Sequence, residues 1–385
     1  MPDVNFLSTP LYKEAVEQIR FMMDGASERQ IRLFGQTWFE KHFKMGDFAR
    51  TESEFTAILG QLHAAPAAST INQYSERPIR SIEGFGKVKA EMLTAAHTYK
   101  LEAEDLRAIA LYQKLYPAAK DRQKVLDYIV KKLMNVRERA VKGVQERIDI
   151  TVLSLLSNDG KYTITKDNDP GSPFIGTELD FGFDQKHAVK VSTASDVWSE
   201  TNAATVDVLE DLLAICDEAQ ANGYSFEKIL LRREQLMYML TTAKLKRYIN
   251  GVNYADKPIT IEDVNTFFSK YGIPQFELVR HMSTIEYDGG RSRTSFQPWK
   301  LGKLLFVPSD NFGTIEHLMT DADLIGPDEG VQYAKYNHIE VTNWEQGLKE
   351  NTNHTEFVSA ALTSTPVVDI IKDMWSLDVL TPARQ

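Results

Sequence analysis

Apolar residues recur every three or four positions over residues 121–157, which is the longest regular pattern in the chain. They are Val125, Ile129, Leu133, Val136, Ala140, Val144, Ile148, Val152 and Leu155. This spacing places them on one face of a single helix, about 55 Å long at about 1.5 Å per residue. The stripe follows the 3.6-residue period and not strict heptads, so it favours a spine that carries a sheet over a coiled coil.

Helical and alternating patterns succeed one another after the turn at 158–160. Strands are expected at 161–165, 187–191, 228–231, 276–280 and 304–307, and helices at 205–222, 233–249 and 261–271. Thr260 and Asp263 have the spacing of a capping box at the start of the last helix. This mixture predicts an α/β unit over 201–322. Residues 333–385 return to short strands.

The first 93 residues have a different character. Residues 1–62 indicate short amphipathic helices, the third at about 53–62, and together they are too short to bury a core. Residues 63–93 are small, polar and interrupted by Pro and Gly, and end where Val88 and Ala90 alternate with charged residues. So long a segment with few apolar anchors is unusual inside a compact domain. It is either flexible or supported by another chain.

Composition narrows the class of protein. The chain has 385 residues, of which 43% are apolar and 25% charged, so it is globular. Its net charge of -10 argues against a protein whose main task is to bind nucleic acid. The single Cys216 cannot form an intrachain disulfide. Without a signal-peptide pattern or an apolar run of about 18 residues, we expect a soluble intracellular protein.

Motifs for catalysis or cofactor binding are missing from the sequence. It contains no G-x-S-x-G, Walker loop or H-E-x-x-H. Residues 167–178 partly resemble a calcium loop, but Ser172 replaces the glycine of the sharp turn, so a surface turn is the better interpretation. We therefore expect no enzyme activity, catalytic residue, metal or cofactor. The alternative is an α/β enzyme with an unrecognised site within 201–322.

Basic residues are frequent along the long helix, and Lys131, Lys132 and Arg139 are the candidates for contact with nucleic acid. One interpretation is a solvated face held by i,i+4 ion pairs. The other is weak, non-specific contact with nucleic acid phosphates, which would be sensitive to salt.

Several blocks occur in an order that resembles one protein family. They are GKYTIT at 160–165, LDFG at 179–182, VWSE at 197–200, KILLRREQLMYML at 228–240, FQPWKLGKLLFVPSDNFG at 296–313 and NHTEFVSAALTSTPVVDII at 353–371. Their order and spacing resemble the tailed-bacteriophage major capsid proteins of the Hong Kong 97-type fold, most closely the lambda-type branch. The similarity covers roughly residues 100–385, and the N-terminal part matches poorly.

The resemblance implies an α+β fold with an N-terminal arm, an extended E-loop, a peripheral domain and an axial domain. The arm corresponds to residues 1–62 and the E-loop to residues 63–93. The peripheral domain corresponds to residues 94–200 with 323–385, and the axial domain to residues 201–322. It also implies a major capsid (head) protein that assembles as pentamers and hexamers into an icosahedral virion shell around double-stranded DNA. Scaffold, portal and decoration proteins would be its other partners. An encapsulin-like nanocompartment shell or a portal component are the alternatives of related type.

Contacts between subunits are then expected from the loop and the arm. The candidates are Arg77, Ile79, Arg80, Ile82, Phe85 and Val88 on the loop, and Phe34, Trp38 and Phe39 on the arm. Their apolar side chains would serve as anchors on a neighbouring subunit.

Overall fold

A computed structural model describes residues 10–23, 37–59, 86–101, 103–116, 119–252, 257–287, 292–326, 331–346 and 355–383. The chain divides into two compact units. The first consists of Met1–Glu54, Glu91–Asp149 and Ile315–Pro366, and the second of Phe55–Ala90, Ile150–Thr314 and Val367–Gln385.

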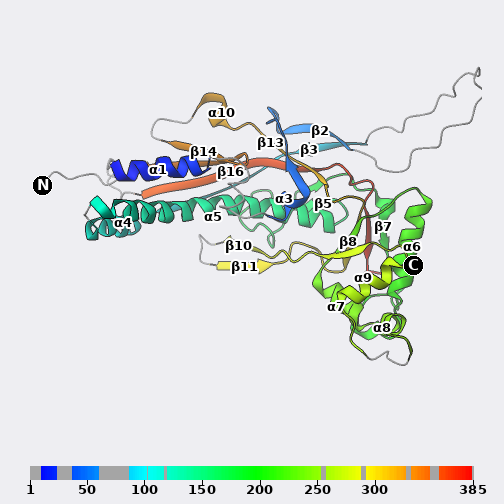
Figure 1. Cartoon of the computed structure of the whole chain (residues 1–385). Coiled ribbons are helices and arrows are strands. Elements are labelled where there is room, and N and C mark those ends of the chain that lie inside the picture. Colours follow the sequence, from blue (N-terminus) through cyan, green and yellow to red (C-terminus); the bar gives the residue numbers. More distant parts are fainter. Residues whose placement is uncertain are drawn as a thin grey trace, which may run out of the picture. The chain divides into compact units, whose positions relative to one another are not determined.

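The first unit is built on a six-stranded sheet with the order β1-β13-β16-β15-β14, in which β4 also pairs with β16. Its strands are β1 (Phe43–Met45), β4 (Leu93–Leu101), β13 (Gly313–His317), β14 (Gln332–Tyr336), β15 (Ile339–Gln346) and β16 (Thr355–Val368). Its helices are α1 (Pro10–Met23), α3 (Phe39–His42), α4 (Ala103–Leu115), α10 (Asp321–Ile325) and most of α5 (Arg122–Ser157). Helix α1 packs against β14 (Figure 1).

Helix α5 is the predicted spine, and it is 36 residues long. Every member of its apolar stripe is buried except Val136, which is half-buried. Helix α4 lies beside the start of α5, because the rings of Tyr112 and Tyr128 stack with centroids 4.0 Å apart. The prediction of one long helix whose apolar stripe is buried is therefore confirmed. Near its C-terminal end the helix is buried on its other sides as well, where Asp149, Ile150, Leu153 and Leu156 are each at most 2% exposed.

Strand β4 approaches α5 closely, at a glycine. A Cβ atom built on Gly143 would lie 1.9 Å from Cε1 of His97, a residue of β4. The same imidazole lies with Nε2 2.8 Å from the carbonyl oxygen of Ala140, one turn earlier in the helix. Glycine at 143 thus makes room for the ring that joins the sheet to the helix.

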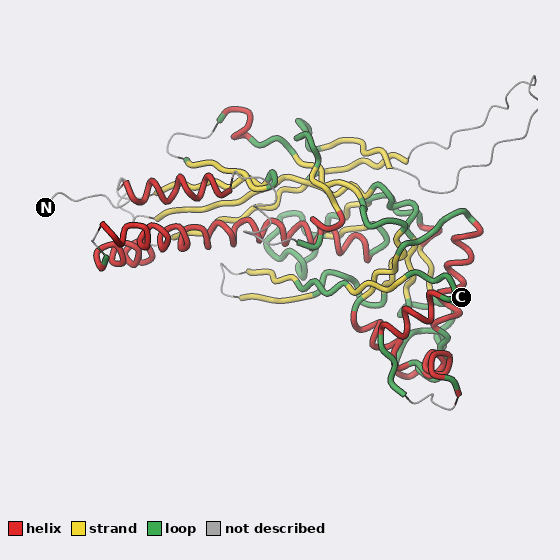
Figure 2. Tube along the Cα trace, viewed as in Figure 1, coloured by secondary structure: helices red, strands yellow, loops and turns green. Residues whose placement is uncertain are grey.

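The second unit has a five-stranded mixed sheet with the order β7-β17-β12-β8-β9. These strands are β7 (Ala188–Lys190), β17 (Trp375–Asp378), β12 (Lys303–Val307), β8 (Lys228–Leu231) and β9 (Gln275–Leu278). The helices around it are α6 (Val208–Ala221), α7 (Arg233–Thr241), α8 (Ala243–Asn250) and α9 (Ile261–Ser269) (Figure 2). Ile229, Phe268, Phe306 and Trp375 belong to its buried core.

Three two-stranded sheets complete the described strands. They are β2 (Glu54–Leu59) with β3 (Gly86–Glu91), β5 (Lys161–Thr163) with β6 (Glu178–Asp180), and β10 (Ser283–Tyr287) with β11 (Ser292–Phe296). The helices and strands of the two units together are those of an α+β fold, as expected.

A buried ion pair fixes the turn after α5 within the second unit. Lys303 is 2% exposed, and its Nζ lies 2.8 and 3.0 Å from the two carboxylate oxygens of Asp159. The hydroxyl of Ser376 donates to the same carboxylate at 2.6 Å. A buried charge with a partner and a further hydrogen bond tolerates removal from water, whereas an unpaired one does not.

Two local predictions are wrong. Residues 54–59 form strand β2 and not a third helix, because they pair with β3, a partner too distant for periodicity to reveal. The expected helix 233–249 is interrupted at Thr242, which has extended backbone angles. The hydroxyls of Thr241 and Thr242 both donate to the carbonyl of Tyr238, and such bonds compete with helical ones. In addition, strands β1, β4, β6, β10, β11 and β13 lie outside every range that the sequence predicts as strand.

Replacing Gly143 tests the contact between β4 and α5. Alanine favours a helix by about 1 kcal/mol over glycine. Here the overlap with His97 outweighs that gain, so we expect Gly143→Ala to lower the free energy of unfolding by roughly 1–3 kcal/mol. In a His97→Ala background the same change is expected to be neutral or stabilising. Urea titration of the four proteins measures both effects, and equal effects in the two backgrounds would contradict this packing.

Candidate inter-subunit and nucleic-acid surfaces

Of the predicted loop residues, only Val88 lies within the part of the chain that the structure describes. Val88 lies on β3, which pairs with β2 in a sheet of its own. The other loop candidates, Arg77, Ile79, Arg80, Ile82 and Phe85, lie outside the described residues, as does Phe34 of the arm.

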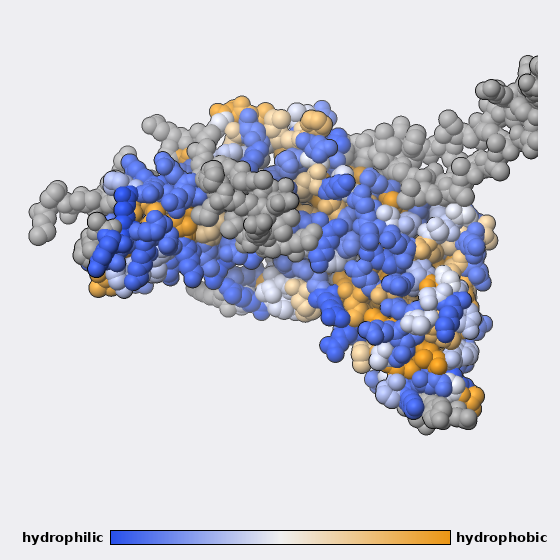
Figure 3. Space-filling view, in the orientation of Figure 1, coloured by the Kyte–Doolittle hydropathy of each residue, from blue (hydrophilic) through white to orange (hydrophobic). Residues whose placement is uncertain are grey.

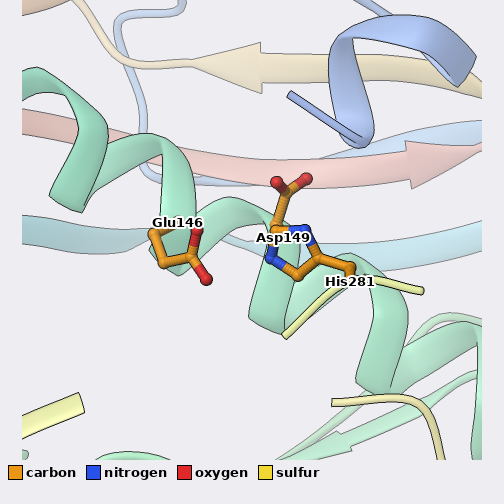
Figure 4. A group of neighbouring side chains, drawn as sticks. All are labelled: Glu146, Asp149 and His281. Atoms are coloured by element: carbon orange, nitrogen blue, oxygen red, sulfur yellow. The ribbon is translucent and has the colours of Figure 1, made fainter. Parts of the chain in front are cut away.

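The described arm candidates, Trp38 and Phe39, are held by a carboxylate on α5. The backbone N–H of Phe39 donates to Oδ1 of Asp149 at 2.7 Å, and that of Trp38 donates to Oδ2 at 3.3 Å. Figure 4 shows the Asp149 carboxylate pointing from α5 towards the short helix α3. Asp149 therefore serves the N-terminus of that helix, where an anion is favoured.

Of these two candidates, only Trp38 keeps part of its side chain at the surface. Phe39 is 1% exposed within its own chain, so its ring belongs to the core of the first unit and is not available as an anchor for a neighbour. The ring of Trp38 is half-buried and lies 4.6 Å from that of His42, centroid to centroid. Sequence periodicity alone cannot tell an inward from an outward aromatic residue in so short a helix.

Helix α1 is attached to the sheet through a buried polar network. The hydroxyl of Tyr12 on α1 donates to Oε2 of Glu356 at 2.5 Å, and Nδ2 of Asn343 donates to Oε1 at 2.6 Å. The guanidinium of Arg137 on α5 lies 3.8 Å from Oε1. Glu356 is fully buried, so its charge depends on these partners. Burial lowers the pKa of Arg137, and the charge of Glu356 opposes this shift.

The segment that leads from β1 towards β2 is fixed to β13. The backbone N–H of Gly46 donates to the carbonyl of Ile315 at 2.9 Å, and that of Arg50 donates to the carbonyl of His317 at 2.8 Å. Nε of Arg50 also donates to Glu316 at 2.7 Å. We call Gly46–Arg50 with Glu316 and His317 the loop base, because β2 follows it directly.

Two histidines meet at the loop base. The rings of His317 and His338 lie 4.1 Å apart, centroid to centroid, and His338 occupies the tight turn between β14 and β15 with φ of 68°. His317 is 3% exposed. Burial, with the proximity of His338 and Lys335, lowers its pKa to about 4, although Glu316 and Asp323 act in the opposite direction. The ring of His317 is therefore neutral at pH 7. Burial, with the proximity of Lys335, also lowers the pKa of His338.

The candidate nucleic-acid residues share one exposed face of α5. Lys131, Lys132 and Arg139 are all exposed. Arg137 differs from them because it is buried in the network around Glu356. The visible surface at the end of the first unit that carries α4 is mainly hydrophilic (Figure 3). A basic stripe on a solvated helix face suits contact with phosphates without base recognition.

The second unit offers little support for nucleophilic chemistry. Burial raises the pKa of the Cys216 thiol to about 11, so it stays protonated at neutral pH and is a poor nucleophile. Burial also raises the pKa of Asp211 to about 6, and its carboxylate accepts a hydrogen bond from Nε1 of Trp198 at 2.8 Å. That bond gives Asp211 a structural role in holding the buried indole.

Comparison with protein families identifies the chain. Residues 42–343 match the family model described as "Phage major capsid protein E", which covers most of the sequence. The chain belongs to this family. It is thus a structural protein, the major capsid protein of a tailed phage, and forms an icosahedral shell. The elements of this capsid protein, which include the long helix α5, the pair of β2 with β3 and the α/β unit, are those expected of the Hong Kong 97-type fold.

Solved structures similar to this capsid protein are distant in sequence. The putative capsid protein of a prophage of E. coli CFT073 is 11% identical with a TM-score of 0.48, and 95% of this chain and 97% of that chain are covered. The procapsid of satellite phage P4 with its size determination protein is 10% identical with a TM-score of 0.45, and 96% of this chain and 97% of that chain are covered. The capsid of Myoviridae phage XM1 is 9% identical with a TM-score of 0.39, and 89% of this chain and 90% of that chain are covered. A search of curated proteins found no match.

Among the described residues, no helix combines the length and the apolar character that a membrane span requires.

Acid is expected to weaken the first unit through His317. The pKa of this residue is about 4 when folded and 6.5 when free, so the unfolded chain binds more protons between these values. The free energy of unfolding therefore falls as the pH drops through that window, by about 2 kcal/mol from pH 7 to pH 5. Urea titration at both pH values measures it. A His317→Gln variant with the same pH dependence would refute this assignment.

Proposed function

We propose that this capsid protein forms rings of five and six copies that close into a shell around double-stranded phage DNA. The observation that carries the proposal is the family match over 42–343, which includes the loop base, α5 and the α/β unit. Rings require heterologous contacts, in which one surface of a subunit meets a different surface of the next. The paired strands β2 and β3 and the arm supply surfaces of that kind.

The parts of the chain take different roles in this proposal. Residues 201–322 form the axial domain that meets around the ring axis, and residues 94–200 with 323–385 form the peripheral domain. The arm, residues 1–62, and the E-loop, residues 63–93, tie each subunit to its neighbours. Among the candidates, Arg77, Ile79, Arg80, Ile82, Phe85, Val88, Phe34 and Trp38 are proposed for these contacts. Phe39 is left out because it is buried.

The shell also needs partners other than itself. We propose scaffold, portal and decoration proteins as these partners, with assembly in the host cytoplasm and no enzyme activity of the chain itself. Packaged DNA is proposed to touch Lys131, Lys132 and Arg139, because these residues are exposed together on α5. The net charge of -10 limits such contact to a local surface.

Charges placed on the E-loop test the contacts between subunits. The double variant Phe85→Asp with Val88→Asp is expected to abolish assembled particles while the far-UV circular dichroism of the subunit stays unchanged, because buried carboxylates without partners oppose association. The matched control is Phe174→Asp with Ile175→Asp, since these side chains are 54% and 42% exposed on a surface turn. Sedimentation velocity after co-expression with the neighbouring phage genes measures particles. Normal shells from the loop variant would contradict the proposal that the E-loop makes contacts between subunits.

Charge reversal on α5 tests the contact with DNA. Removing Lys131, Lys132 and Arg139 by substitution with Glu is expected to reduce the slope of log K against log salt for duplex DNA by about 3, at roughly 0.9 per phosphate contact. The matched control reverses Lys166, Lys186 and Lys190, which are exposed on the second unit. Filter binding of unassembled subunits between 50 and 200 mM salt, roughly the range in which such slopes are resolved, provides the measurement. Equal slopes for the two triple variants would exclude this face of α5.

A further inference from the structure

A cavity of about 320 Å³ lies within the first unit, between α1 and the β14–β15 hairpin. Its apolar walls are formed by Val16 and Ile19 of α1, Val331 and Ala334 at β14, and Val341 of β15. This volume lies in the range of small-molecule sites, which are mostly apolar with a few polar groups. A dry cavity of about 150 Å³ already accepts a benzene ring. The cavity has room for a ring and its substituents.

Two buried polar side chains line the same cavity. Asn343 is 7% exposed, and its Oδ1 accepts no hydrogen bond from any residue within the described ranges. Arg137 is 4% exposed. Its guanidinium donates to the carbonyl of Leu133 at 3.3 Å but lies 3.8 Å from Glu356, beyond hydrogen-bond length. Among the described residues, the cavity therefore combines a buried acceptor without a donor, Oδ1 of Asn343, with a buried guanidinium, that of Arg137, which has further N–H groups available as donors.

We propose that this cavity binds a neutral phenol group, that is, an apolar ring with one hydroxyl group. A hydroxyl group both donates and accepts, so it can donate to Oδ1 of Asn343 and accept from Arg137. The ring would contact Val16, Ile19 and Val341 and remove their apolar surface from water.

Charged ligands fit this site less well. A carboxylate has no proton for Asn343 and would be placed close to Glu356, which already balances Arg137. An ammonium group would be placed close to the guanidinium of Arg137 in a region shielded from water. A plain hydrocarbon would leave both polar side chains without partners. The buried groups thus select a neutral ligand with one hydroxyl group.

Binding would affect the attachment of helix α1, which belongs to the arm, to the sheet of the first unit. Helix α1 contributes two walls of the cavity and is held to the sheet by the bond from Tyr12 to Glu356. A ligand that touches α1, β14 and β15 together stabilises the docked position of α1, since it binds the folded arrangement alone. This site goes beyond the capsid function and does not depend on it.

The experiment uses the unassembled full-length chain and the probe p-cresol, with toluene, p-toluate and 4-methylbenzylamine for comparison. Ligand-observed NMR titration gives the affinities at pH 7. We expect p-cresol to bind at least about tenfold more tightly than each of the other three, because each loses a hydrogen bond to a charged or buried group. Toluene binding as tightly as p-cresol, or no binding of p-cresol, would overturn the proposal.

Variants that fill the cavity locate the site. Ala334→Phe and, separately, Val16→Phe each place a ring in it and are expected to weaken p-cresol binding at least about tenfold. Ala108→Phe adds the same ring on the exposed face of α4 and is expected to leave binding unchanged. Unchanged binding by a folded cavity variant would also overturn the proposal, and the probe series on the native chain decides the matter if both variants fail to fold.

A phenol group has two sources, a free molecule or the tyrosine side chain of a second copy, and assembled particles separate them. Particles that still bind p-cresol identify a free molecule as the ligand, whereas a tyrosine from a neighbour would block the cavity on assembly. Because the main titration uses unassembled chain, a failure of shell formation leaves its result unaffected.

Discussion

The structure depends on burying one face of a 36-residue helix along its whole length. In proteins, most of the stability of a helix comes from packing of its apolar face, so α5 requires continuous partners. Gly143 admits the ring of His97 from β4, Arg137 is balanced by Glu356 from β16, and Lys303 neutralises Asp159 just after the helix. Gly143 and Arg137 are exceptions on the helix itself, and Asp159 lies in the turn that ends it. Each of the three has a specific partner far away in the sequence.

The arm and the loop depend on the same frame. Helix α1 is attached through Tyr12 to the carboxylate that balances Arg137, and the loop base is attached to β13 by backbone hydrogen bonds and the pair of Arg50 with Glu316. In the proposed shell the arm and the loop meet neighbouring subunits, and these bonds hold α1 and the loop base on the sheet of their own subunit.

Elements that depend on local periodicity could be predicted from the sequence. Features that depend on a partner distant in the sequence could not. The spine helix, the capping box of Thr260 with Asp263 and strand 228–231 follow from residues close together in the chain. Strand β2 and the burial of Phe39 depend on β3 and on Asp149, which local patterns do not reveal. Neither Gly143 nor Asn343 belongs to a sequence motif. The close approach of His97 to Gly143 and the unpaired Oδ1 of Asn343 among the described residues arise only when the chain folds.

The central claim is that copies of this chain build a closed shell from rings of five and six. Electron cryomicroscopy of particles purified after co-expression with the neighbouring phage genes tests it most directly. The account predicts icosahedral particles in which five- and six-fold rings are built from subunits of 43.7 kDa, with the strands β2 and β3 of one copy lying on the next. A monomer that stays at 43.7 kDa under these conditions, or one ring without a shell, would contradict it.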